Sequence, residues 1–175
     1  MVITTSSHLQ TTPLTSLCYL LSKKSEALKA YKFFEAWAIT QQHSTKIKVL
    51  HSDRRGEYLS KEFNKHLAAA GMAWRLTTHN MLQLNGIAKR LNWMLLERIR
   101  ALGYTSRLPQ MLWGKALHHA TWLKNQTATC TLDGRMPFEA LYRTTPDLSE
   151  ARPWGCKVWV HDDTGSKLGI CTYEG

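Results

Sequence analysis

The sequence predicts an α/β layered domain, and three observations lead to this fold class. The chain has 175 residues, the length of one ordinary domain. Hydrophobic residues make up 43% of it, with seven Trp, six Tyr and four Phe, which is typical of a chain with a packed core. Segments of strand and helix character alternate in the order strand, helix, strand, helix, strand, and further helices follow.

The first half of the chain begins with a strand, a helix and a second strand. Residues 1–12 are rich in Thr and Ser after a short apolar start, and residues 17–21 (LCYLL) predict a strand. Ser25 is a candidate N-cap for a helix that ends near residue 41 and has apolar residues at helical spacing. Residues 47–50 (IKVL) then predict the second strand.

A helix and a short strand follow in the middle of the chain. Ser60 is a candidate N-cap for a helix over residues 61–70, which Gly71 closes. Residues 73–77 predict a short strand. The next segment, 78–86 (THNMLQLNG), reads as a loop because it ends in an Asn-Gly pair.

The second half predicts mainly helices. A longer helix should cover about residues 87–102. Its core-facing side carries Ile87, Leu91, Met94, Leu95 and Leu102, with Arg98 interrupting them. Its opposite side carries Lys89, Asn92, Trp93 and Arg100. Another helix should follow residues 108–109, residues 137–142 (PFEALY) predict a short helical turn, and residues 157–161 (KVWVH) predict a strand.

The charge of the chain favours a polyanionic partner. The net charge is +10, from 23 Lys and Arg against 13 Asp and Glu. Between Phe63 and Leu132 only one acid, Glu97, occurs among nine Lys and Arg residues, so the middle of the chain carries the positive field. Cations that meet phosphates release condensed counterions, which would support DNA or RNA binding through a basic surface. A basic protein without such a partner is the alternative.

Several classes of protein do not fit the composition. Four widely spaced Cys residues form no C-x-x-C pair, and His118–His119 lacks a cysteine neighbour, so we expect reduced, buried thiols rather than a zinc module. No signal peptide and no run of 18 apolar residues is present. We therefore expect a soluble intracellular protein, in the nucleus or cytoplasm, without a membrane partner.

Asp53 is the first candidate functional residue. It lies in HSDRRGEYLS, where the predicted strand 47–50 should end, beside Arg54 and Arg55. A carboxylate at the exit of a strand among basic residues suits divalent-metal chemistry on a nucleic acid, but such a site needs further carboxylates. The alternative is that Asp53 only caps the end of the strand.

From Leu20 onward the sequence resembles the integrase core of copia-type long-terminal-repeat retrotransposons. The blocks that carry the resemblance are LLSKKSEAL, SDRRGEYLSKEF, QLNGIAKRLNWMLLERIR, LPQMLWGKAL, PFEALY and WGCKVWVHDDTGSKL, in the family's order over residues 20–168. The resemblance implies a ribonuclease H-like core, with a mixed five-stranded sheet flanked by helices. We expect this integrase catalytic core at residues 1–125, and a C-terminal extension with the start of a downstream module at 126–175. The family's upstream His/Cys zinc domain is expected to be missing.

In that family three acids hold two Mg²⁺ or Mn²⁺ ions. The second acid corresponds to Asp53. The third is a glutamate 35 intervening residues later, where this sequence has Lys89. The first belongs to the opening strand, but residues 1–25 contain no acid. A gapped match places Ser6–Ser7–His8 there, and an ungapped one places Gln10 and Thr11. The opening strand is therefore degenerate, Asp53 is the only retained acid, and we expect no bound metal.

Other substitutions also indicate a decaying transposon copy. Relative to the family, Lys89 replaces Glu, Trp93 replaces Arg and Arg55 replaces Gly, and each change requires one C-to-T or G-to-A step. Trp113 matches a core position of the family and is expected to pack. Trp93 is expected to be exposed on the polar side of its helix. Substitute metal ligands are conceivable at Glu57, His79 or His8.

The resemblance and the charge together suggest a nucleic-acid-binding set. Gln83, Asn85 and Gly86 match the family's Q-x-N-G turn, which approaches DNA in the family and could equally be a simple helix-entry turn. Lys89 would either pair with Asp53 or contact a phosphate. The candidate contacts are Arg54, Arg55, Lys61, Lys65, Gln83, Asn85, Lys89, Arg90, Arg98 and Arg100.

These inferences define three functional hypotheses. The resemblance implies an ancestral role in DNA integration by metal-dependent strand transfer, and the lost acids predict a pseudoenzyme that retains at most nucleic-acid binding. An active metal-dependent nuclease with substitute ligands is the second hypothesis, so the sequence leaves open whether the chain is an enzyme. The third is a non-catalytic partner, either as a homo-oligomer or with intact integrases.

Overall fold

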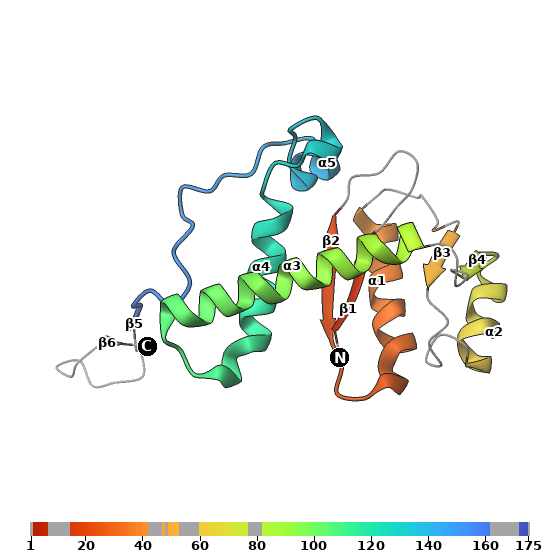
Figure 1. The fold of residues 1–175 in the computed structure, drawn as a ribbon, viewed down its shortest axis with the longest axis horizontal. Helices are drawn as coiled ribbons and strands as arrows, with labels where there is room; N and C mark the ends of the chain where they lie inside the picture. Colours follow the sequence, from red (N-terminus) through yellow and green to blue (C-terminus); the bar gives the residue numbers. More distant parts are fainter. Residues whose placement is uncertain are drawn as a thin grey trace.

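The computed structural model describes residues 2–6, 15–41, 47, 49–52, 60–76, 82–161 and 172–174. Strands and helices alternate in the first half of the chain, and helices dominate the second (Figure 1). The strands are β1 (Val2–Ser6), β2 (Ser16–Leu20), β3 (Val49–Ser52), β4 (Ala73–Leu76), β5 (Trp159–His161) and β6 (Thr172–Glu174). The α-helices are α1 (Ala27–Gln41), α2 (Lys61–Ala69), α3 (Leu82–Ser106), α4 (Trp113–Asn125) and α5 (Pro137–Tyr142). No helix among the described residues is long and apolar enough to cross a membrane.

The described strands form three separate pairs. β1 and β2 are antiparallel, with Ser6 opposite Ser16, and β5 and β6 are also antiparallel. β3 and β4 are parallel, with Ser52 opposite Leu76, and α2 connects them as a β-α-β unit. The structure thus has the α/β character and the mixed strand directions that the sequence predicted. A continuous five-stranded sheet is not confirmed in the described part of the chain.

The opening strand forms despite its unusual composition. Val2–Ser6 makes a full antiparallel register with β2, although the sequence predicted a degenerate strand here. A run of four consecutive β-branched residues accounts for this, because Val, Ile and Thr favour extended backbone. The strand nevertheless contains no acid, as its sequence VITTS shows.

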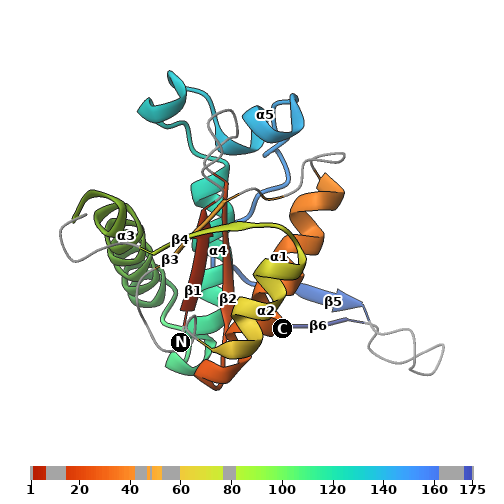
Figure 2. The same ribbon diagram turned by 90° about the vertical axis from the view of Figure 1, so that its right-hand side faces the viewer.

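β2 separates two hydrophobic clusters. Leu17 and Tyr19 pack against the cluster of α1 and α2, which centres on Phe63. Cys18 points the other way and joins Leu95 of α3 and residues of α4. Cys18 is thus a buried thiol as predicted, whereas the prediction is wrong for Cys130 and Cys156, which are exposed. Successive side chains of a strand point to opposite faces, so one five-residue strand serves both clusters. Figure 2 shows the resulting layers, with α3 on one side of the β1–β2 pair and α1 on the other.

Both ends of α2 match the sequence prediction, and the start of α1 does not. Ser60 caps α2 by accepting a hydrogen bond from the Phe63 N–H at 3.2 Å, and Gly71 follows the helix with φ +67°. The prediction that Ser25 is the N-cap of the first helix is wrong. A 3₁₀ turn over Lys24–Glu26 comes before α1, and Glu26 caps the entry by accepting the N–H groups of residues 22 and 23 at 2.9 and 3.1 Å.

α3 is longer than predicted at both ends. It begins at Leu82, so the predicted turn at 83–86 lies inside the helix instead. A glycine within a helix costs about 1 kcal/mol relative to Ala, which a 25-residue helix packed on α4 and β1 can accommodate. The helix also passes Gly103 and ends at Ser106. There Arg107 adopts φ +55° and Pro109 follows, and both prevent continuation.

The segment after α4 packs back onto the first half of the chain. The Thr15 hydroxyl donates a hydrogen bond to the Pro137 carbonyl at 3.5 Å, and the Pro137 side chain is fully buried. Further on, Gly155 lies against Ser106 at the end of α3, where a Cβ added to the glycine would be 2.4 Å from the Ser106 Cβ. The segment therefore contacts the residue directly before β2 and the end of α3.

Candidate functional site

The first part of the candidate site is the C-terminal edge of the β3–β4 pair. Trp74 Nε1 donates a hydrogen bond to Ser52 Oγ at 2.9 Å, and Ser52 is buried. This bond ties the last residue of β3 to β4 directly before Asp53. Asp53, Arg54 and Arg55 themselves lie outside the described residues. So do three residues named as possible substitute ligands, Glu57, His79 and His8.

The second part of the candidate site is α3, the helix that carries Lys89 and follows β4 in the sequence. Because β4 ends at Leu76 and α3 begins at Leu82, the connection is short. Lys89 lies seven residues into α3, which is about 10 Å along a helix axis. Its side chain is exposed. The helix therefore presents a cation to solvent at the position where the family resemblance implies a glutamate.

The residues at the three positions that the resemblance implies do not fit a pair of divalent metal ions. Ser6, the first of the two candidate positions for the opening acid, ends β1 with a hydroxyl instead of a carboxylate. Lys89 brings positive charge, so Asp53 would be the only carboxylate of the three. Mg²⁺ sites rely on carboxylate oxygens, and a nearby ammonium repels the ion. Within the described part of the chain, no group of three or more His, Cys, Asp or Glu residues could hold a metal ion.

The outer face of α3 gathers three of the six basic candidates that the structure describes. Lys89, Arg90 and Arg100 are all exposed, as is Trp93, whereas Leu95 on the opposite side is 1% exposed. The prediction that Lys89, Trp93 and Arg100 point away from the core is confirmed, whereas Asn92, predicted on the same side, is half-buried. Gln83 and Asn85 lie in the first turns of the same helix, and their side chains are outside the described set.

Other candidates lie elsewhere. Lys61 and Lys65 are exposed on α2, a different helix. Arg98 is half-buried on the side of α3 that faces α4, so it does not share the exposed face with Lys89. The expected packing of Trp113 is wrong, because its side chain is 48% exposed. Trp113 is the first residue of α4. It lies on the same side of the helix as the buried Leu117, but at the N-terminal end of the helix.

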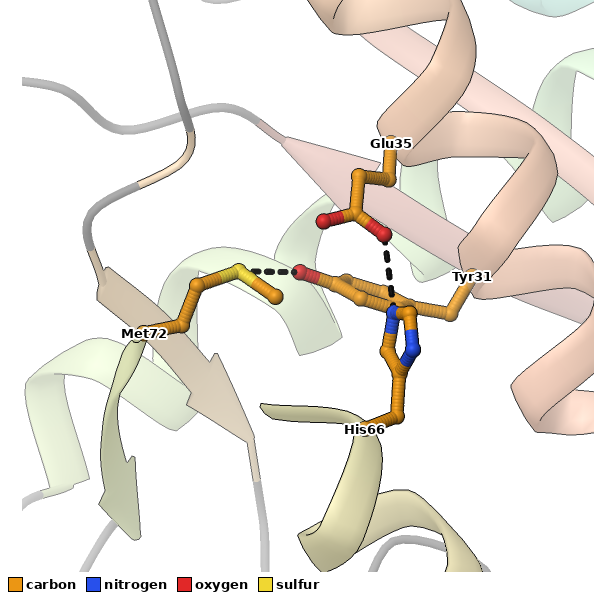
Figure 3. A network of polar contacts seen from close by, with 4 residues as sticks. All are labelled: Tyr31, Glu35, His66 and Met72. Atoms are coloured by element: carbon orange, nitrogen blue, oxygen red, sulfur yellow. Dashed lines mark hydrogen bonds and ion pairs between the residues drawn. The ribbon is translucent and has the colours of Figure 1, made fainter. Parts of the chain in front are cut away.

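A polar network holds α2 against α1 (Figure 3). His66 Nε2 lies 2.8 Å from Glu35 Oε2, and the Tyr31 hydroxyl donates a hydrogen bond to Met72 Sδ at 3.2 Å. Burial and the neighbouring Glu35 charge raise the pKa of Tyr31, so it remains a donor at neutral pH. A hollow of about 340 Å³ adjoins His66 between the two helices, with Lys65 in its lining. The network positions α2, which links β3 to β4.

A second polar cluster joins β2 to α4. Lys124 Nζ donates to Ser16 Oγ at 2.8 Å, and Asn125 pairs with the Ser16 backbone through two bonds of 2.9 and 2.8 Å. Ser16 is fully buried. Burial, assisted by the Arg98 charge, lowers the pKa of Lys124 to about 8. Sequence reasoning missed this cluster, since its partners are more than 100 positions apart.

The chain is similar to parts of two transposon polyproteins. No family model matches it. It is 28% identical over 143 residues to the retrovirus-related Pol polyprotein from transposon TNT 1-94 of Nicotiana tabacum, which covers 82% of the chain. It is 25% identical over 154 residues, 86% of the chain, to the corresponding polyprotein from transposon RE1 of Arabidopsis thaliana. The matches take up 11% and 10% of these two relatives, so the chain spans about a tenth of their length.

Two solved integrase structures are similar to this chain in fold. An intasome of simian T-cell lymphotropic virus, in complex with PP2A regulatory subunit B56 gamma, aligns with a TM-score of 0.54 at 18% identity, covering 91% of this chain and 55% of its own. The catalytic core domain of HTLV-2 integrase in complex with magnesium, in a trimeric form, aligns with a TM-score of 0.52 at 14% identity, covering 80% and 93%. The chain is an integrase-core-like retrotransposon region.

The relatives and neighbours of this integrase-core-like region agree with its α/β fold. The integrase neighbours imply the ribonuclease H-like class, in which helices flank strands of mixed direction. At these identities the structural likeness concerns the fold only. Among the candidate site residues, Lys89 is described by the structure and lies exposed on α3.

Proposed function

We propose that this integrase-core-like region binds nucleic acid and does not catalyse strand transfer. The observation that carries the proposal is the exposed Lys89 on α3, at the position where the family resemblance implies a metal-binding glutamate. The same exposed face carries Arg90 and Arg100. One substitution thus removes a metal ligand and adds to a surface that suits phosphate.

The argument against catalysis is one of charge. In two-metal phosphodiester chemistry, carboxylates hold the ions that stabilise the attacking and leaving oxygens. The HTLV-2 integrase core was solved in complex with magnesium. In this chain Asp53 would lack both partner carboxylates, because Ser6 (or Gln10 or Thr11) and Lys89 occupy the other two positions. We therefore infer that neither Mg²⁺ nor Mn²⁺ is bound.

The argument for binding is also one of charge. The chain has a net charge of +10, and the described α3 face presents three cations against one acid, Glu97. Phosphate contacts by Lys and Arg release counterions, which gives sequence-tolerant affinity that falls steeply with salt. The intasome neighbour comes from an integrase assembly. DNA or RNA is accordingly the partner that we propose for this face.

Metal binding can be tested by calorimetry with Mg²⁺ and Mn²⁺. The natural chain should give no binding heat, whereas a variant with Lys89→Glu and Ser6→Asp should bind, because it restores two carboxylates beside Asp53. A variant with Lys61→Glu and Ser6→Asp has the same net charge and is the matched control, which should stay silent. Tight binding by the natural chain, abolished by Asp53→Asn, would instead establish the metal-dependent nuclease, and EDTA-sensitive cleavage would accompany it.

Nucleic-acid binding can be tested separately by fluorescence anisotropy across a salt series. Each phosphate contact contributes roughly 0.7 to 0.9 to the slope of log affinity against log salt. Lys89→Ala with Arg100→Ala should therefore reduce the slope by about 2. Lys115→Ala, an exposed position on α4, is the control. Absence of binding at low salt, together with co-purification of an intact integrase, would favour the non-catalytic partner instead.

A further inference from the structure

The exposed face of α3 combines cations with aromatic rings. Lys89, Trp93, Arg100 and Tyr104 follow one another at spacings of four, seven and four residues, so they fall within an arc of about 60° on the helix surface. Trp93 is 61% exposed and Tyr104 is 88% exposed. We call these four residues the outer stripe of α3.

The outer stripe is turned away from the core. Leu95 and Leu102 occupy the opposite side of the helix and pack in the cluster shared with α4. Trp93 and Tyr104 are therefore not needed to hold α3 in place. Eleven residues separate the two rings, which is about 16 Å along a helix axis. A ligand that contacts both must be extended along the helix.

The charges on this face select among possible occupants. A second protein with an apolar surface would have to desolvate Lys89, Arg90 and Arg100 with only Glu97 on the same face to offset them. A polyanion instead gains from every one of these cations. Exposed aromatic rings that alternate with cations are the arrangement on which unpaired bases stack while phosphates follow the positive charges.

We propose that the outer stripe of α3 binds single-stranded nucleic acid, with bases stacked on Trp93 and Tyr104 and phosphates against Lys89 and Arg100. The proposal rests on the proposed nucleic-acid binding and adds its substrate class. A duplex presents its phosphates to Lys89 and Arg100 but hides the faces of its bases. The two rings therefore confer a preference for unpaired strands that the cations alone cannot.

The test compares three fluorescent ligands of equal length: a short oligo-dT strand, an abasic strand and a duplex. Trp93→Ala and Tyr104→Ala should each weaken oligo-dT binding about tenfold, since one stacked base is worth roughly that factor. Binding of the abasic strand and the duplex should change by less than about twofold, because neither ligand stacks on the rings. Trp93→Phe should restore part of the affinity, and Trp159→Ala, at a ring 70% exposed on β5, should leave it unchanged.

Each outcome separates this proposal from the proposed function. Equal losses on all three ligands, or no loss in either alanine variant, would overturn the stacking while leaving phosphate binding intact. Loss of self-association on Trp93→Ala, measured by sedimentation and without a base-dependent change, would make the stripe a contact with a second copy and overturn the proposal. If the double variant Lys89→Ala with Arg100→Ala binds all three ligands with unchanged affinity, the proposed function itself fails. Unchanged urea midpoints show that the variants remain folded.

Discussion

Raising the pH from 7 to 9 should stabilise the fold, because α4 buries Lys124. Burial lowers the pKa of this ammonium from 10.5 to about 8. Below pH 8 both the folded and the unfolded chain hold the proton, and the full cost of burying the charge is present. Between pH 8 and 10.5 the unfolded chain still binds a proton that the folded chain has released. The free energy of unfolding therefore rises with pH in this interval.

The size of the effect follows from the shift. One pKa unit corresponds to about 1.4 kcal/mol, so the gain at pH 9, one unit above the folded pKa, is about 1.4 kcal/mol. Cys18 and Tyr31 act in the opposite direction at higher pH. Burial raises the pKa of both groups above their usual values of 9.0 and 10.0. The unfolded chain then loses protons first, and stability falls. The rise should be confined to the interval between about pH 8 and 9.

Urea unfolding followed by tryptophan fluorescence at pH 7, 8 and 9 measures this directly. The natural chain should gain stability over the series, and Lys124→Met should not, because it carries no titrating group at that position. Lys115→Met, on an exposed part of the same helix, should behave as the natural chain does. A flat or falling profile in the natural chain, or an unchanged rise in Lys124→Met, would refute the assignment of a buried, proton-releasing lysine.

Three further predictions concern packing. Phe63→Ala removes a fully buried ring from the α1–α2 cluster and should lower the free energy of unfolding by about 3 to 5 kcal/mol in urea titrations; a loss below 1 kcal/mol would mean that the ring is not in the core. Trp74→Phe deletes the bond to Ser52 and should lower it by about 1 kcal/mol, with Trp159→Phe as the neutral control. Gly155→Ala adds a Cβ that would lie 2.4 Å from the Ser106 Cβ at φ +79°, so limited proteolysis should cut near residue 155 faster than in the natural chain, and equal cutting rates would contradict the close packing.

The elements with clear local signals were predictable. The cap at Ser60 and the end of α2 before Gly71 match the sequence expectation, and the strand before Asp53 forms two residues later than predicted, at Val49–Ser52. α3 was harder because Gly86 and Gly103 read as boundaries. Helix propensity is a weak preference, and packing on α4 and β1 carries the helix through both glycines. Tyr104 was overlooked for that reason, because the predicted helix ended before it.

The candidate site was predictable in part. The period of α3 correctly placed Lys89, Trp93 and Arg100 on the polar side. It could not tell that Arg98 would be half-buried beside α4, since that depends on where the second helix lies. The network of Tyr31, Glu35, His66 and Met72 gave no signal at all, because its partners lie 31 and 41 positions apart.

The sequence by itself determined which residues occupy the ligand positions and which side of each helix is polar. The absence of an acid before position 25, and the lysine at position 89, are covalent facts that no folding can alter. Only the tertiary structure decided that β2 divides two clusters and that Lys124 is desolvated over Ser16. The physical reason is the separation along the sequence over which each interaction acts. Capping and periodicity act over a few residues, whereas burial and pKa depend on neighbours that the chain brings together from 108 positions away.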